Sequence, residues 1–147
     1  MTNLVFIDSN IWLYSFLKQE EEKRKTAKKL IKSIKQECIF VNTQIINEVC
    51  YNLKKNNFPE VEIKGILSSF YSDFNVSHFT GEIMLNASKL RGKYSLSFWD
   101  SLIIASALSE ECTLIYSEDM QHNQTIEKKL KIINPFLPLA TRTEGRI

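Results

Sequence analysis

A short apolar run near the N-terminus constrains the fold of this chain more than any other feature. Residues 4–7, Leu-Val-Phe-Ile, are continuously apolar and rich in strand-forming side chains, and Asp8 follows directly. A half-solvated strand would alternate apolar and polar residues, whereas a continuous run predicts a strand buried on both faces. Such strands are typical of parallel sheets. The run therefore predicts an α/β protein with an acid at the carboxyl end of its first strand.

The rest of the sequence alternates between helical and strand-like segments. Polar residues that can cap a helix stand before several of the helical segments: Ser9 or Asn10, Thr43, Thr80 and Ser97. We expect further strands at residues 38–42, 75–79, 113–116 and 130–133, and helices at 9–17, 20–35, 43–55, 60–71, 80–90 and 98–108. This order predicts a three-layer α/β/α sandwich around a mainly parallel sheet of about four to five strands.

Size and composition are ordinary for a soluble globular protein. The 147 residues fit one domain, and we expect residues 1–138 to form it, with 139–147 as a flexible C-terminal tail. No apolar stretch approaches the roughly 18 residues of a membrane span, and no cleavable leader precedes the first strand, so we expect a cytoplasmic protein. The three cysteines lack paired spacing, which fits buried free thiols in a reducing compartment and argues against a zinc site.

Four carboxylates stand beside apolar runs in four separate parts of the chain: Asp8, Glu48, Asp100 and Asp119. Ligands of open parallel sheets bind beyond the carboxyl ends of the strands, where Asp8 and Asp119 follow their strands. Glu48 and Asp100 lie in the first turns of helices that we expect near the same edge. Converging acids repel one another, and hard divalent ions with oxygen ligands, Mg²⁺ or Mn²⁺, relieve that repulsion. The acids therefore indicate a metal-dependent enzyme that acts on phosphates.

Each acid also has a purely structural interpretation. Asp100 can serve only as part of a helix cap, Glu48 as a solvated helix residue and Asp119 as a turn residue. Asp8 has few structural uses directly after a buried strand. The basic residues of the stretch 18–35 have two interpretations as well: a face that binds phosphates, or the solvated side of an amphipathic helix.

Five segments together resemble the PIN domain, and within it the VapC-type toxin ribonucleases of type II toxin–antitoxin pairs. One short motif alone is weak, but all occur in order and cover most of the chain from about Leu4 to Phe136. The matching segments are residues 6–14 (FIDSNIWLY), 43–49 (TQIINEV), 97–107 (SFWDSLIIASA), 116–121 (YSEDMQ) and 132–136 (IINPF).

The resemblance implies that the four acids hold one or two Mg²⁺ or Mn²⁺ ions and hydrolyse RNA phosphodiester bonds. Asn10 and Ser117 fit the auxiliary polar positions beside the metal, although as a cap and a turn hydroxyl they also have ordinary roles. The family commonly has a glycine after His122, and here Asn123 occupies that place. Asparagine can also take a left-handed conformation, so we expect only a small local change.

The resemblance also implies the partners. Single-stranded RNA or an exposed loop is the expected substrate, with tRNA or rRNA as targets. An antitoxin would cover the cleft, and a homodimer is expected. Aromatic residues that can line a groove for the antitoxin, a dimer face or simply the core are Trp12, Tyr14, Phe16, Phe70, Tyr71 and Phe74.

Other functions fit less well. A haloacid-dehalogenase-type phosphatase needs a second Asp two residues after the first, where this chain has Asn10, and a receiver domain needs an acidic pair where Ser9 stands. A non-catalytic RNA- or protein-binding module with the same fold remains the alternative. Such a module typically loses one of the acids, whereas all four are present.

Overall fold

The computed structural model describes residues 3–138, and the expected C-terminal tail, residues 139–147, lies outside the described residues. Six strands form one sheet in the order β3-β2-β1-β4-β6-β5. The strands are β1 (Val5–Ile7), β2 (Ile39–Asn42), β3 (Asn75–Ser77), β4 (Leu114–Tyr116), β5 (Thr125–Ile126) and β6 (Leu130–Ile133). All neighbours pair in parallel except β5, which is antiparallel to β6. The predicted mainly parallel sheet is confirmed, with β5 as an addition.

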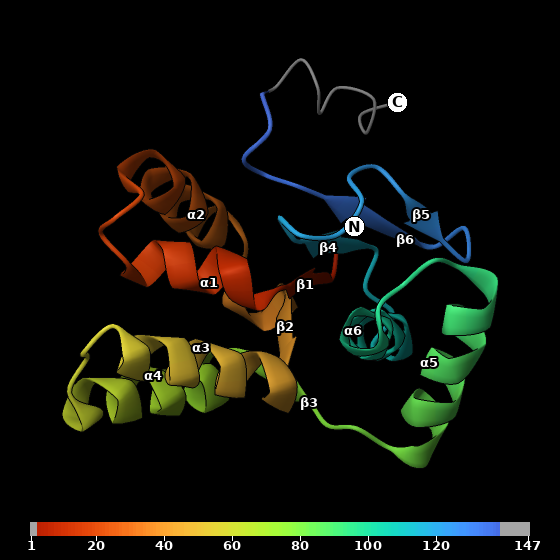
Figure 1. The fold of residues 1–147 in the computed structure, drawn as a ribbon, viewed down its shortest axis with the longest axis horizontal. Helices are drawn as coiled ribbons and strands as arrows, with labels where there is room; N and C mark the ends of the chain where they lie inside the picture. The colour runs from red at the N-terminus through yellow and green to blue at the C-terminus, as the bar shows by residue number, and fades with distance from the viewer. Residues whose placement is uncertain (1–2, 139–147) are drawn as a thin grey trace.

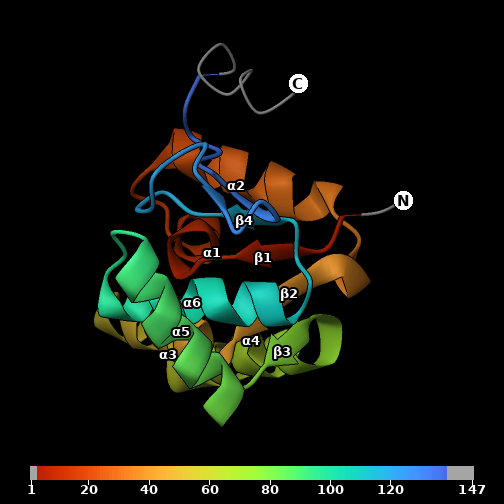
Figure 2. The same cartoon turned by 90° about the vertical axis from the view of Figure 1, so that its right-hand side faces the viewer.

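Helices cover both faces of the sheet (Figures 1 and 2). Figure 1 shows α1–α4 on one side and α5 and α6 on the other, which confirms the three-layer sandwich. Helix α1 packs on α2 and α3, α3 packs on α4, and α5 packs on α6. The helices are α1 (Ser9–Phe16), α2 (Glu21–Ser33), α3 (Thr43–Lys55), α4 (Glu60–Asp73), α5 (Gly81–Lys93) and α6 (Phe98–Ser109), with a short 3₁₀ helix, η1 (Gln36–Cys38), before β2.

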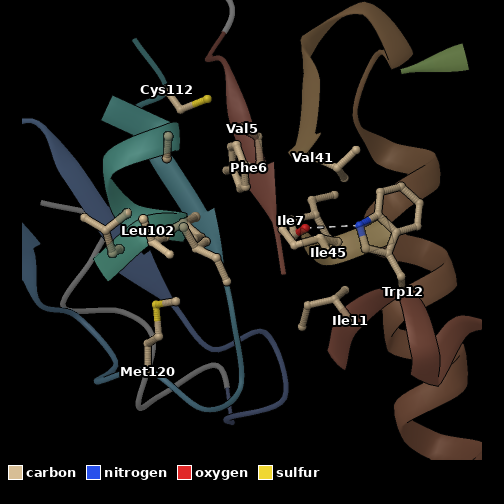
Figure 3. Close-up of a cluster of buried hydrophobic side chains, with 14 of the residues drawn as sticks. Val5, Phe6, Ile7, Ile11, Trp12, Val41, Ile45, Leu102, Cys112 and Met120 are labelled. Carbon is tan, nitrogen blue, oxygen red and sulfur yellow. Dashed lines mark hydrogen bonds between the residues drawn. The ribbon is translucent and has the colours of Figure 1, made fainter. Parts of the chain in front are cut away.

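Strand β1 lies at the centre of the core (Figure 3). Val5, Phe6 and Ile7 are all buried, as the continuous apolar run predicts. On the α1 side, the indole Nε1 of Trp12 donates to the carbonyl oxygen of Ile7 at 3.1 Å, so this buried tryptophan is satisfied at the end of the strand. Because β1 is buried on both faces, its path through the core is fixed. Asp8 therefore has a defined position at the carboxyl end of the strand.

Two helix caps differ from the prediction. Helix α1 is capped by Asp8, which accepts from the backbone N–H of Ser9, so the cap precedes the residues we expected. Helix α3 is capped by Asn42, which accepts from Ile45 N at 2.8 Å, and not by Thr43. In both cases the last polar residue of a parallel strand reaches over the first turn of the next helix. Strand and helix are therefore joined without a loop.

Helix α2 carries most of the basic stretch and is amphipathic. Ala27 is buried, and Leu30, Ile31 and Ile34 pack against the core. Among the described residues, no helix is both long and apolar enough to cross a membrane. The cysteines are free, with Cys38 and Cys112 buried.

Candidate functional site

Asp8 is the most buried of the four predicted acids, with 5% of its surface exposed. It follows β1 directly, and its backbone N–H donates to Tyr116 O of β4 at 3.0 Å. Its Oδ1 accepts from Ser9 N at 2.8 Å, and its Oδ2 accepts from the Ser117 hydroxyl at 2.8 Å. Both carboxylate oxygens are thus held in place by the adjoining ends of β1 and β4.

Burial raises the pKa of Asp8 from its ordinary value of 3.8 to about 6. The hydrogen bonds from Ser117 and Ser9 lower this pKa in part, whereas the negative charges of Glu48 and Asp100 raise it further. Three of the four acids therefore interact electrostatically, although they come from β1, α3 and α6. The charges of Glu48 and Asp100 thus act on Asp8 across three separate elements of the fold.

Asp119 lies in the segment after β4 and is tied to α1 by Asn10. The Asn10 Nδ2 donates to Asp119 Oδ2 at 3.0 Å, and Asn10 Oδ1 accepts from Glu118 N at 3.2 Å. The hydroxyl of Ser117 accepts from Asp119 N at 3.3 Å while donating to Asp8. The two residues predicted as auxiliary, Asn10 and Ser117, therefore connect Asp119 to the N-terminus of α1 and to Asp8.

Glu48 and Asp100 approach from two other helices. Glu48 of α3 accepts from the Ser9 hydroxyl at 3.4 Å and from Gln44 Nε2 at 3.2 Å. Asp100 lies in the first turn of α6, and its backbone N–H donates to the hydroxyl of the predicted cap, Ser97, at 3.1 Å. Burial raises the pKa of Asp100, the Ser97 bond lowers it, and the charge of Asp119 raises it. Asp100 thus links Asp119 electrostatically to the acids around Asp8.

The family model of the PIN domain matches residues 5–128 of this chain. The chain belongs to the PIN domain family. In sequence alone, no curated protein matches it.

Several solved structures share this fold, and among them are a toxin–antitoxin complex and a toxin. A toxin–antitoxin complex from Klebsiella pneumoniae has a TM-score of 0.69 at 19% identity, over 90% of this chain and 98% of that one. VapC20 of Mycobacterium tuberculosis, a sarcin-ricin loop cleaving toxin, has a TM-score of 0.62 at 16% identity, over 76% of this chain and 86% of that one. DNA-bound VapBC from Salmonella typhimurium has a TM-score of 0.62 at 16% identity, over 90% and 97%. At such identities the similarity shows the fold.

The acids of this PIN domain fit a hard divalent cation by their chemistry. All four offer carboxylate oxygens, the ligands that Mg²⁺ and Mn²⁺ prefer. None of the four forms an ion pair with Lys, Arg or His within residues 3–138. In the same residues, no group of three or more Asp, Glu, His or Cys side chains is close enough to hold one ion.

A second network near the site was not predicted. Lys23 of α2 forms an ion pair with Glu118, and the Tyr14 hydroxyl donates to Glu118 Oε1 at 2.7 Å. The bond to Glu118, with that to Tyr14, raises the pKa of Lys23. Because Glu118 precedes Asp119, this network fixes the segment after β4 against α1 and α2. The sequence did not predict this network, because nothing in the sequence around Glu118 indicates its contacts with Lys23 and Tyr14.

Asn123 takes the left-handed backbone conformation that asparagine can adopt. Asn123 has φ of 68°, where glycine is commonly found. Its backbone N–H donates to Ile132 O at 2.8 Å, so the turn connects the segment after β4 to β6. Asparagine tolerates this conformation better than most residues do. Asn123 therefore keeps the turn in place of the glycine that is common at this position.

Proposed function

We propose that this PIN domain is a metal-dependent endoribonuclease and the toxin of a toxin–antitoxin pair. The observation that carries the proposal is Asp8, a nearly buried acid whose pKa is raised to about 6 by burial, with contributions from Glu48 and Asp100. A fold that only needed a helix cap at this position would place it among neutral side chains. Four acids gathered without an ion pair fit a site whose charge is completed by a cation.

In this proposal, Asp8, Glu48, Asp100 and Asp119 are the catalytic residues and hold one or two Mg²⁺ or Mn²⁺ ions. When bound, such ions supply an activated water and stabilise the charge that develops on the phosphate oxygens. The chain's own residues orient the ligands. Ser117 fixes the rotamer of Asp8 through its hydroxyl, and Asn10 fixes Asp119 through its amide.

We further propose that RNA with unpaired nucleotides, in tRNA or rRNA, is the substrate. The support is the fold shared with a toxin that cleaves the sarcin-ricin loop, together with an acidic site flanked by a basic helix, α2. Basic surface beside the acids attracts the phosphate backbone of RNA. Cytoplasmic action fits these targets and the free cysteines.

An antitoxin partner is proposed for the apolar groove between α1 and α4. Trp12, Phe16, Phe70 and Phe74 line this groove, whose volume is about 600 Å³. Tyr71, which we expected there, is 51% exposed outside the groove lining. Tyr14, expected there too, packs edge-on against Phe136 at 5.0 Å. The structural neighbours that are toxin–antitoxin complexes support a protein segment as the occupant.

Two further parts of the proposal concern the organisation of the protein. We propose that residues 1–138 form a single domain and that the protein is a homodimer.

Cleavage of end-labelled tRNA and rRNA by the purified protein tests the nuclease. We expect discrete fragments with Mn²⁺, none with EDTA and none with Asp8→Asn or Asp119→Asn. Asp73→Asn is the matched control, because Asp73 is exposed at the end of α4, and it should cleave like the wild type. A folded, Mn²⁺-loaded protein that cleaves neither RNA would favour the non-catalytic binding module.

A further inference from the structure

Two large aromatic side chains are exposed at the start of α6, immediately before Asp100. Phe98 is 50% exposed and Trp99 is 60% exposed. Their rings meet edge to face, with centroids 5.3 Å apart and planes at 79°. Large apolar side chains that lie side by side on a surface are candidates for a binding site. This pair is the candidate that directly precedes one of the acids, Asp100.

This aromatic pair is held in a defined arrangement. The guanidinium carbon of Arg91 lies 4.4 Å from the centroid of the Phe98 ring, a cation–π geometry. Arg91 is fixed in turn, since its Nη1 donates to the Ser101 hydroxyl at 2.7 Å. Phe98 is thus supported from one side by Arg91 while its ring borders Trp99. A rigid aromatic surface loses little side-chain freedom when a ligand binds.

Trp99 also forms one wall of a groove of about 530 Å³ that extends to Glu48. The other lining residues are Thr43, Gln44, Asn47 and Phe79. Two aromatic rings, two amides, a hydroxyl and one carboxylate line the groove, and none of these six residues is a cation. A phosphate would meet the charge of Glu48 without compensation. A flat, neutral group with hydrogen-bonding edges suits this lining better.

Gln44 adds an independent sign of a missing ligand. Its Nε2 donates to Glu48 Oε1 at 3.2 Å, whereas its Oε1 is buried and accepts no hydrogen bond within residues 3–138. Buried polar atoms almost always have a partner in folded proteins. The unused atom is an acceptor that the protein covers, so a ligand with an N–H group would satisfy it once the Gln44 amide turns toward the groove. Nucleobases combine such an N–H with a flat ring that stacks on tryptophan.

We propose that this groove binds one unpaired nucleobase of the RNA substrate, stacked on Trp99 with an N–H directed to Gln44. The inference rests on the proposed ribonuclease function. Glu48 belongs both to the groove and to the acidic site, so the bound base lies next to the phosphodiester to be cut. Base pairing would hide the base from the groove. The groove therefore restricts cleavage to unpaired RNA and contributes to the choice of sequence.

Tryptophan fluorescence measures this binding directly, without catalysis. The chain has two tryptophans, and Trp12 is 3% exposed whereas Trp99 is 60% exposed. Short single-stranded oligoribonucleotides added in EDTA should quench the emission, because a stacked base contacts Trp99. The same oligoribonucleotides with an abasic position at each nucleotide keep every phosphate. They should leave the emission unchanged.

Labelled RNA and fluorescence anisotropy measure the contribution of each side chain. Trp99→Ala should weaken binding by roughly 5- to 150-fold, the range for loss of one base stack, while Trp99→Phe should retain most of the affinity. Gln44→Met should change the preference among the four homopolymers, because it removes the acceptor. Tyr51→Ala is the matched control: Tyr51 is 65% exposed on α3 outside the groove, and its loss should not alter binding.

Equal affinity for normal and abasic RNA, or an unchanged affinity in Trp99→Ala, would overturn the inference. A Trp99→Ala protein that binds RNA normally but dissociates from a second copy or from a protein partner would assign the surface to protein contact instead. The two proposals fail separately. Cleavage that needs Asp8 and ignores Trp99 would refute only the base-binding groove. Base binding through Trp99 without any cleavage would refute only the nuclease.

Discussion

Replacing Asp8 by asparagine should make the metal-free protein more stable above about pH 6. Asp8 has an ordinary pKa of 3.8 that burial raises to about 6 in the folded chain. That difference disfavours the ionised form in the fold by about 3 kcal/mol. Asparagine has similar size and no charge, so it avoids this cost. Asparagine also lacks the second carboxylate oxygen that accepts from the Ser117 hydroxyl, and this loss reduces the gain by about 1 kcal/mol. The expected net gain is about 2 kcal/mol.

The effect depends on pH in a defined direction. Below 3.8 the carboxyl is protonated in both the folded and the unfolded chain, so it contributes no pH dependence. Between 3.8 and about 6 the unfolded chain releases the proton while the folded chain retains it. The folded state then binds more protons, so stability falls as the pH rises through this window. Above it both states are ionised and the full cost remains. Asp8→Asn should lack this decline.

Urea denaturation in EDTA, followed by circular dichroism from about pH 4 to pH 8, measures the difference. We expect Asp8→Asn to be less stable than the wild type by about 1 kcal/mol at the acidic end and more stable by about 2 kcal/mol at the alkaline end. Asp73→Asn, at an exposed position, is the control. A wild type that is the more stable protein at about pH 8 in EDTA, or parallel pH profiles, would refute the argument from burial.

Three further predictions concern the surroundings of the site. Ser117→Ala should destabilise the fold by about 1–3 kcal/mol in urea denaturation, because its hydroxyl bonds both Asp8 and Asp119 N; an unchanged midpoint would contradict this. Lys23→Met should cost about 1 kcal/mol by thermal denaturation and Lys25→Met almost nothing, since Lys25 is exposed and 4.0 Å from its partner; equal costs would contradict it. Asn123→Val should cost about 1–2 kcal/mol in the same assay and Asn123→Gly very little, because φ is 68°; similar melting temperatures for the two would exclude backbone strain as the cause.

The parallel strands were predictable because burial on both faces leaves a continuous apolar run. Strand β5 was not predicted, because it is too short to leave an apolar run in the sequence. It has two residues and turns back into β6 through Glu127 and Lys128, which have φ of 53° and 58°. Tight turns with two positive φ values usually carry Asn or Gly, and a Glu-Lys pair gives no such signal. The sequence also predicted that the helix ends at about residue 90, whereas α5 continues through Gly92 to Lys93. Packing of α5 on α6 outweighs the helix-breaking tendency of one glycine.

The four acids could be predicted as a group because their expected positions follow from topology. An acid at the end of a parallel strand lies at the same edge of the sheet as every other strand end. The groove beside them could not be found in that way. Residues 101–107 of α6 are buried, so the helix is apolar on all sides, and its sequence does not distinguish Trp99 from core. Its exposure depends on how α5 and α6 pack.

Asp8 performs two tasks with conflicting electrostatic requirements. As the cap of α1 it accepts from Ser9 N, and the positive end of the helix dipole favours its charge. As the most buried of the four acids it lies near Glu48 and Asp100, and burial with these charges disfavours its charge more strongly, since its pKa rises. A cap alone would be better served by a neutral asparagine, as at Asn42 before α3. On the proposed function, the carboxylate is retained because a cation both relieves its cost and requires its charge. The same substitution should therefore stabilise the metal-free protein and abolish the stabilisation that Mn²⁺ gives the wild type.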